Sequence, residues 1–126
     1  MVVESVVLLK TVEPGQGFRD MQPFKEIVGE ARIAALGEAT HGTREFFQPR
    51  HRMLEFLVEE MGFRVFAMEA NWTEALRVND YVLRGEGDAA KVLAGLYFWV
   101  WNTEEVLAMI EWMRSYNLDP THAAIC

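Results

Sequence analysis

The apolar run Arg32-Ile-Ala-Ala-Leu36 leads directly into Gly37-Glu-Ala-Thr-His-Gly42. A short apolar run that ends at a glycine is typical of a buried strand followed by a loop. A second apolar run of the same length, Arg64-Val-Phe-Ala-Met68, lies downstream and ends in Glu69-Ala-Asn71. We interpret these two runs as candidate strands.

The segment between the two apolar runs has the period of a helix. Pro49 would remove a backbone bond to Glu45, so we expect the helix to start near Gln48 or to kink there. Gly62 is well suited to cap its C-terminus. Strand, helix and strand in this order predict a right-handed parallel βαβ unit. The apolar side chains that gather on one side of the helix are Phe46, Phe47, Met53, Leu54, Leu57, Val58 and Met61.

Helical patterns dominate the remainder of the chain. Asn102 and Glu105 have the spacing of a capping box, which predicts a helix from there to Tyr116. Further helices are expected at residues 21–30, 73–83 and 88–96.

The predicted sheet is too small to form a complete core. A parallel sheet needs cover on both faces, and two strands rarely achieve that alone. We therefore predict an α/β fold in which a parallel βαβ unit with several flanking helices is part of a larger fold. Residues 1–126 form a single partial domain in this interpretation, and residues 118–126 form an atypical tail.

Composition and charge narrow the class of protein. Of the 126 residues, 51% are hydrophobic, which favours a folded core over disorder. The net charge of −7 disfavours nucleic acid and membrane surfaces as partners, because both are polyanionic. Residues 1–10 are apolar but lack the basic start of a signal peptide, and no stretch approaches the ~20 apolar residues of a membrane span. We expect a cytoplasmic protein.

Polar side chains follow both predicted strands at the point where each one ends. Glu38 and His41 follow the first strand, and Glu69 follows the second. Ligands gather at the carboxyl ends of parallel strands, so these groups are expected to meet at one sheet edge. A histidine beside a carboxylate can act as a general base, because imidazole titrates near neutral pH and the carboxylate stabilises its cation. Spacing alone leaves open that they are ordinary surface or capping groups.

Arg50 falls near the centre of the apolar side of the predicted helix. A guanidinium on a buried face needs a partner or a water-filled cleft. Arg50 therefore reaches toward Glu38, Glu69 or an anionic substrate, or its long side chain extends past the apolar side to solvent. Both interpretations stay open. His51 and Arg52 fall outside the apolar side and are expected to be solvated.

The remaining candidates are aromatic residues and metal ligands. Trp99, Trp101 and Trp112 are more consistent with core packing than with a ligand platform. Glu38, His41 and Glu69 offer atoms that zinc accepts, but these three residues come from two loops and no HExxH helix is present. Cys126 is the only cysteine, which excludes a thiolate site within the chain. We expect neither a metal nor a cofactor.

The string Leu36-Gly-Glu-Ala-Thr-His-Gly42, followed by Glu45-Phe46 and then Arg50, resembles the opening motif of the erythromycin esterase family. The resemblance covers roughly residues 30–117. It continues through Leu57-Val-Glu-Glu-Met-Gly-Phe63, Phe66-Ala-Met-Glu69, Asn79-Asp-Tyr-Val82, Trp101-Asn-Thr-Glu-Glu105 and Trp112-Met-Arg-Ser-Tyr-Asn117.

This resemblance implies an α/β fold with many helices, and hydrolysis of the lactone ester of macrolide antibiotics by the characterised members. It implies that His41 is the general base that activates water and that no metal is required. It also implies that Glu38, Arg50 and Glu69 line the same cleft. Family members are several hundred residues long, so the resemblance concerns their N-terminal portion.

We therefore expect an esterase-like hydrolase in which water activated by His41 attacks a small-molecule ester. Glu38 or Glu69 would orient the imidazole, and Arg50 would hold the carboxylates or polarise the carbonyl. The alternative is a non-catalytic remnant, or a module of the same fold that binds a partner or oligomerises. Self-association fits that alternative, because uncovered apolar surface promotes it.

Overall fold

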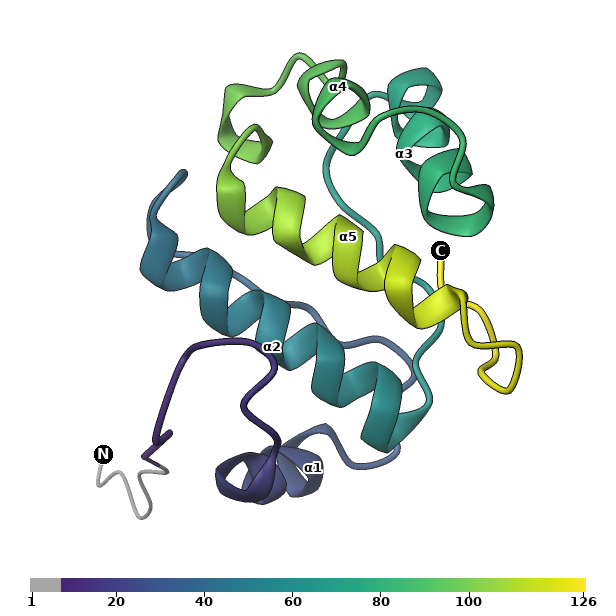
Figure 1. Cartoon of the computed structure of the whole chain (residues 1–126). Coiled ribbons are helices and arrows are strands. Elements are labelled where there is room, and N and C mark those ends of the chain that lie inside the picture. The colour runs from purple at the N-terminus through teal and green to yellow at the C-terminus, as the bar shows by residue number, and fades with distance from the viewer. Residues whose placement is uncertain (1–7) are drawn as a thin grey trace.

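The structure is a computed structural model that describes residues 8–126. Most of the apolar start considered above, residues 1–7, lies outside it. Helices account for all of the regular structure in the described range (Figure 1). In chain order the elements are η1 (Arg19–Met21), α1 (Gln22–Val28), α2 (Arg44–Met61), α3 (Trp72–Arg84), α4 (Ala89–Ala94), η2 (Trp99–Trp101) and α5 (Glu104–Asn117).

Helix α5 lies at the centre of the packing. It contacts α2 on one side and α3 and α4 on the other (Figure 1). Each large apolar side chain that this packing buries contributes about 1.5–3 kcal/mol to stability. No helix between Leu8 and Cys126 has the length and apolar character to cross a membrane. The core is formed mainly by Phe47, Leu54, Val58, Val82, Leu93, Leu96, Val106, Met109, Ile110, Met113 and Ile125.

Capping residues and glycine set the ends of the helices, but the predicted start of α2 and the predicted cap of α5 need correction. Helix α2 begins at Arg44, so the predicted start near Gln48 is wrong, and Pro49 lies inside the helix. Proline removes one backbone bond there, and the buried face on both sides of it sustains the helix. Gly62 caps α2 in the left-handed conformation at φ 76°, as predicted. The cap of α5 is Thr103, whose hydroxyl accepts a bond from the Val106 N–H at 3.3 Å, and not Asn102.

The predicted α/β fold with a parallel βαβ unit is wrong for this structure, because residues 8–126 contain no strand. Residues 32–36 and 64–68 are free of helix, but no backbone hydrogen bond joins them in the described chain. A strand exists only when a neighbour completes its ladder. Side chains of both segments instead line one cavity of about 670 Å³, and Ile33 and Val65 are exposed.

The tail after α5 returns to the second extended segment. The Cys126 N–H donates to the Arg64 carbonyl at 3.0 Å, and the Phe66 N–H donates to the Cys126 carbonyl at 2.7 Å. This alternation is the one that parallel strands make, here over a single residue. Ile125 is buried, and the Asn117 side chain bonds both its N–H (2.8 Å) and its carbonyl (2.7 Å). Residues 118–126 are thus fastened to the core.

The N-terminal segment is fastened to α2 by a buried arginine. Arg52 donates to the carbonyl oxygens of Thr11 (2.5 Å) and Gly17 (2.7 Å), and to the Asp20 carboxylate at 2.5 Å. The expectation that Arg52 is solvated is therefore wrong. A single apolar stripe assumes that a helix is covered on one side only, and here the N-terminal segment covers α2 on a second side.

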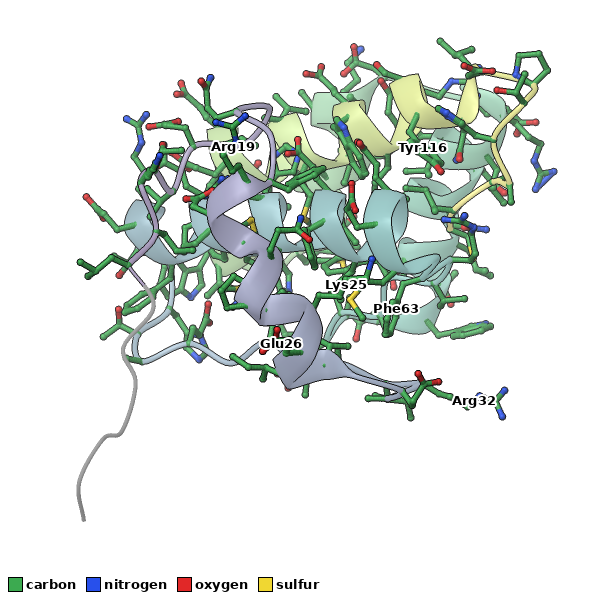
Figure 2. The ribbon with its side chains drawn as sticks, turned by 90° about the horizontal axis from the view of Figure 1, so that it is seen from below. Arg19, Lys25, Glu26, Arg32, Phe63 and Tyr116 are labelled. Atoms are coloured by element: carbon green, nitrogen blue, oxygen red, sulfur yellow. The ribbon has the colours of Figure 1, made fainter. Side chains whose placement is uncertain are left out.

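Helix α1 supplies part of that second cover. Figure 2 shows α1 lying across α2, with Arg32 projecting away from the body of the molecule. Phe56 of α2 is buried between the rings of Phe18 and Phe24, at centroid distances of 5.5 Å and 5.7 Å. Aromatic pairs in edge-on or tilted geometry add to the stabilisation that burial itself provides.

Candidate active site

One cavity contains all four residues that the sequence marks for chemistry. Glu38, His41, Arg50 and Glu69 line the space of about 670 Å³ between the extended segments and α2. They do not lie at the edge of a sheet, as the βαβ interpretation required, because there is no sheet in the described residues. The loops after the two extended segments and the second turn of α2 place them there. Most of the remaining lining is apolar, which is the usual composition of a ligand site.

Glu38 connects two of the other three residues. Its Oε1 lies 2.5 Å from Nδ1 of His41, and its Oε2 accepts a bond of 2.6 Å from Nη2 of Arg50. The side chains of Glu38 and Arg50 are 11% and 10% exposed, whereas that of His41 is 67% exposed. The result is a chain of contacts that starts at a buried guanidinium and ends at an imidazole open to solvent.

The charges around Glu38 keep its carboxyl ionised. Burial raises the pKa of Glu38, but the hydrogen bonds and positive charges of His41 and Arg50 outweigh it and lower the pKa overall. Glu38 therefore presents a negative charge to the His41 ring.

The Arg50 guanidinium is also held by aromatic rings. Its Cζ lies 5.2 Å from the ring centroid of Phe47 and 5.7 Å from that of Trp101. Cation–π contacts of this kind stabilise a guanidinium that has lost part of its water. The sequence left open whether Arg50 meets a carboxylate or extends to solvent. In the structure its guanidinium is paired with the Glu38 carboxylate.

Glu69 lines the cavity without joining this chain of contacts. Its carboxylate makes no ion pair or hydrogen bond within residues 8–126, although its backbone carbonyl accepts a 2.9 Å bond from Nε1 of Trp101. That bond fixes the end of the second extended segment against η2. No group of three His, Cys, Asp or Glu side chains in the described range is arranged to hold a metal ion.

The loop that carries His41 is packed against η2. Gly42 has φ 70°, and a Cβ atom added to it would lie 2.9 Å from Cζ3 of Trp99. The Trp99 side chain is 72% exposed, so its interpretation as a core residue is wrong. Trp101 and Trp112 are partly buried against the core. The sequence feature that could have marked Trp99 as exposed is its place in the aromatic run Tyr97-Phe98-Trp99, because this run belongs to no apolar helical stripe.

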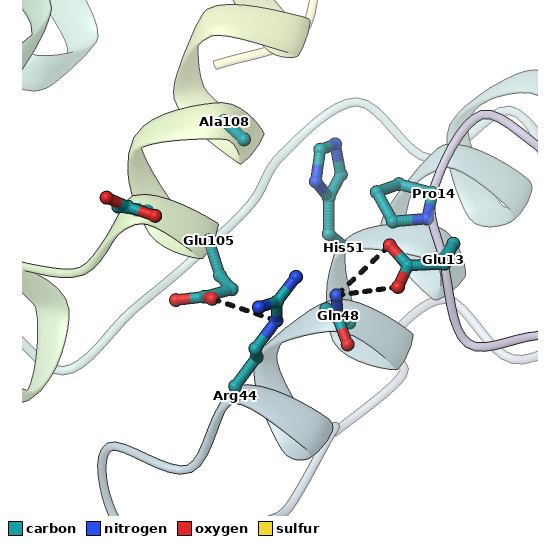
Figure 3. Close-up of a pocket in the computed structure, with 8 residues that line it drawn as sticks. Glu13, Pro14, Arg44, Gln48, His51, Glu105 and Ala108 are labelled. Carbon is teal, nitrogen blue, oxygen red and sulfur yellow. Dashed lines mark hydrogen bonds and ion pairs between the residues drawn. The ribbon is translucent and has the colours of Figure 1, made fainter.

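A second cavity of about 190 Å³ lies between α2, α5 and the N-terminal segment (Figure 3). Gln48 donates from Nε2 to the Glu13 carboxylate at 3.0 Å, and Nε of Arg44 lies 3.4 Å from Oε1 of Glu105. These contacts hold the N-terminal segment and α5 to α2. They share no residue with the chain of contacts around Glu38.

His51 borders this second cavity and is buried, so the expectation that it is solvated is wrong. Burial lowers the pKa of His51 to about 4. Its Nε2 has no hydrogen-bond partner and lies 3.5 Å from Oε1 of Glu55, and its ring stands edge-on to Trp112. Burial raises the pKa of Glu55, whose other oxygen accepts the Gly15 N–H at 2.8 Å. A neutral His51 is thus a packing element of the core.

Known proteins resemble this chain in sequence over most of its length. The sequence profile of the erythromycin esterase family matches residues 58–125. Escherichia coli erythromycin esterase type II is 32% identical over 92% of this chain, and the Bacillus subtilis putative hydrolase YbfO is 28% identical over 76% of it. The chain spans only 27% and 21% of the lengths of these two relatives.

Two crystal structures have a similar fold. A succinoglycan biosynthesis protein superimposes with a TM-score of 0.87 and 42% identity, over 94% of this chain and 30% of that one. A Bacillus cereus protein superimposes with a TM-score of 0.86 and 39% identity, over 94% of this chain and 28% of that one. The helical arrangement described above is therefore common to proteins about three times longer.

Proposed function

Because the chain belongs to the erythromycin esterase family, we propose that it hydrolyses an ester with His41 as the general base. The observation that supports this proposal best is the chain of contacts from Arg50 through Glu38 to His41 at the edge of a largely apolar cavity. A base, a partner that orients it and an adjoining space for a substrate are the parts that hydrolysis by activated water requires.

In this proposal the two ring nitrogens of His41 have different tasks. Nδ1 faces the Glu38 carboxylate, so this nitrogen carries the proton and donates it to the hydrogen bond. Nε2 then keeps its lone pair and accepts a proton from water. The hydroxide formed attacks the ester carbonyl, and the ionised Glu38 stabilises the imidazolium until its proton passes to the departing alkoxide, which leaves as an alcohol.

Arg50 acts through Glu38 in this proposal. Its guanidinium holds the carboxylate oxygen that His41 does not use, which fixes the direction of the carboxylate and favours its ionised form. Glu69 contributes a second carboxylate to the cavity wall, where it can bind the attacking water. Backbone N–H groups near Gly42 are the candidates for the donors that stabilise the oxyanion.

The substrate of the proposed reaction is a small-molecule ester, for which a macrolide lactone is the first candidate because of the named E. coli relative. The mechanism uses neither a metal nor a cofactor. We place the reaction in the cytoplasm, with no nucleic acid or membrane as partner.

A panel of substrates tests the proposal. The purified chain would be assayed with p-nitrophenyl acetate, a macrolide lactone and p-nitroacetanilide, which has an amide in place of the ester. We expect turnover of at least one ester above the buffer rate, no turnover of the amide, and loss of ester turnover in His41→Ala. Ester turnover that His41→Ala retains would overturn the assignment of the base.

The alternative is a non-catalytic module of the same fold, and one observation favours it. Ile33 and Val65, which line the cavity, are exposed apolar side chains. Such a module would self-associate through this apolar surface. Sedimentation velocity at several concentrations separates the two functions: a monomer that hydrolyses esters supports the enzyme, and an inactive oligomer supports the module.

A further inference from the structure

The aromatic segment before α5, residues 97–101, lies against the loop that carries His41. Several contacts hold it there. Nε of Arg44 lies 3.4 Å from Oε1 of Glu105, which joins the first turns of α2 and α5. The rings of Phe47 and Trp101 are 5.9 Å apart, and Trp101 donates to the Glu69 carbonyl. Residues 99–105 are thus fixed to both sides of the candidate site.

Within this segment Trp99 contacts the loop that carries the base. Its indole rests on the Gly42 backbone, because an added Cβ there would lie 2.9 Å from Cζ3 and 3.5 Å from Cη2. Adjacent Cα atoms are about 3.8 Å apart, so the indole lies within about 8 Å of the His41 Cα. A bulky acyl group of an ester held at His41 can therefore reach the indole, which lies beside the His41 loop and outside the lining of the 670 Å³ cavity.

The indole is free to make that contact. Trp99 is 72% exposed although its backbone is fixed, since the Asn102 N–H donates to the Trp99 carbonyl at 3.2 Å. The chain turns into this position through Tyr97, which has φ 58°. A non-glycine residue in that region is conformationally costly, and such cost concentrates at sites that bind ligands. A fixed, exposed aromatic face beside a base binds apolar surface.

We propose that Trp99 is a specificity-determining residue, whose indole binds the apolar part of an ester presented to His41 and so selects bulky ring-bearing acyl groups over small ones. This inference rests on the proposed function. It differs from a positioning role, in which Trp99 would only hold the His41 loop in place through Gly42.

The test compares two esters with the same leaving group, p-nitrophenyl acetate and p-nitrophenyl cyclohexanecarboxylate, so that only the acyl group differs. In Trp99→Ala we expect kcat/KM for the cyclohexane ester to fall about tenfold relative to that for the acetate, which is the effect of losing apolar contact worth one to two methylene groups. Trp99→Phe should retain most of the preference. The control is Tyr97→Ala, which removes an exposed aromatic side chain from the same segment and should leave the ratio unchanged.

A merely structural role gives a different result, because displacement of the His41 loop lowers kcat/KM for both esters equally. An unchanged ratio in Trp99→Ala would therefore overturn the proposal.

If the wild type hydrolyses neither ester, the proposed function fails, and Trp99 is then tested by binding alone. Calorimetry with N-(4-nitrophenyl)cyclohexanecarboxamide should show binding that Trp99→Ala weakens about tenfold, and equal affinity in both proteins, or no binding, contradicts the assignment.

Discussion

Arg50 donates a hydrogen bond of 2.6 Å to Oε2 of Glu38, and both side chains are about nine-tenths buried. The two residues come from different elements, since Glu38 follows an extended segment and Arg50 lies in the second turn of α2. The ion pair therefore fixes the loop that carries the proposed base onto the longest helix. It also leaves Oε1 of Glu38 free for His41.

Removing Arg50 should destabilise the fold. In Arg50→Ala the Glu38 carboxylate keeps its buried position but loses its charged partner. Breaking a buried pair costs about 3–5 kcal/mol, and we expect the low end of this range because the adjoining cavity admits water. Urea unfolding at pH 7 measures the loss. The matched control is Arg84→Ala, which breaks an exposed ion pair with Asp80 and should cost less than about 1 kcal/mol. Equal costs for the two variants would contradict the role of Arg50.

Glu38→Gln should impair catalysis while His41 remains in place. A neutral amide cannot stabilise the imidazolium that forms when His41 takes a proton. Hydrogen bonds to charged groups contribute about 1.5–3 kcal/mol, which corresponds to a decrease of about 10- to 100-fold in kcat/KM. Steady-state kinetics with p-nitrophenyl acetate measures the decrease, and circular dichroism checks that the variant is folded. Unchanged kcat/KM would show that Glu38 does not act on the base.

Acid should weaken the attachment of the N-terminal segment. The hydrogen bond from Arg52 holds the pKa of Asp20 well below its ordinary value of 3.8. A carboxyl with a lowered pKa in the folded state adds stability that is present above pH 3.8 and is lost as the pH falls below it. Melting temperatures of the wild type should therefore decrease steeply below pH 4. Asp20→Asn should be less stable at pH 7 and should lose less on acidification, and parallel curves for the two proteins would contradict this.

His51 should make stability depend on pH in a higher range. Its pKa is 6.5 in ordinary surroundings and about 4 in the fold, so the unfolded chain binds the proton more tightly. The contribution of His51 to the free energy of unfolding is therefore complete above pH 6.5, and it decreases by up to about 3 kcal/mol as the pH falls to 4. Glu55 has a raised pKa and acts in the opposite direction, so the comparison belongs in a Glu55→Gln background. In that background, His51→Phe should abolish the decrease in the free energy of unfolding between pH 6.5 and 4. A decrease that persists in the variant would contradict the role of His51.

The helices could largely be predicted from the sequence, because their signals are local. Gly62 ends α2 as its position suggested, and the periodic segments from residue 73 onward form α3, α4 and α5. The strands could not be predicted in the same way. Residues 32–36 and 64–68 have the composition of strands, but a ladder depends on neighbouring backbone, and the described chain supplies almost none.

The surroundings of α2 show a second limit. A projection with one apolar stripe places Arg50 on the apolar side without deciding between a carboxylate partner and solvent, and it assigns Arg52 and His51 to solvent. Arg52 is buried because the N-terminal segment covers a further side of the helix, and His51 is buried beside Trp112 of α5. Trp99 shows the reverse error, since its size suggested a core position and the structure exposes it beside Gly42. Tertiary contacts between distant segments decide all three cases, and no local pattern records them.

Activation of water by His41 for attack on an ester can be tested with a single pair of rates. The measurement is the hydrolysis of p-nitrophenyl acetate by the purified wild-type chain and by His41→Ala at pH 7. His41 is 67% exposed, so its replacement should leave the fold intact. A positioned general base contributes about 10²–10⁴-fold to a rate, and we expect kcat/KM to fall by a factor in that range in His41→Ala. Equal rates in the two proteins, whether fast or no faster than buffer, would contradict the account.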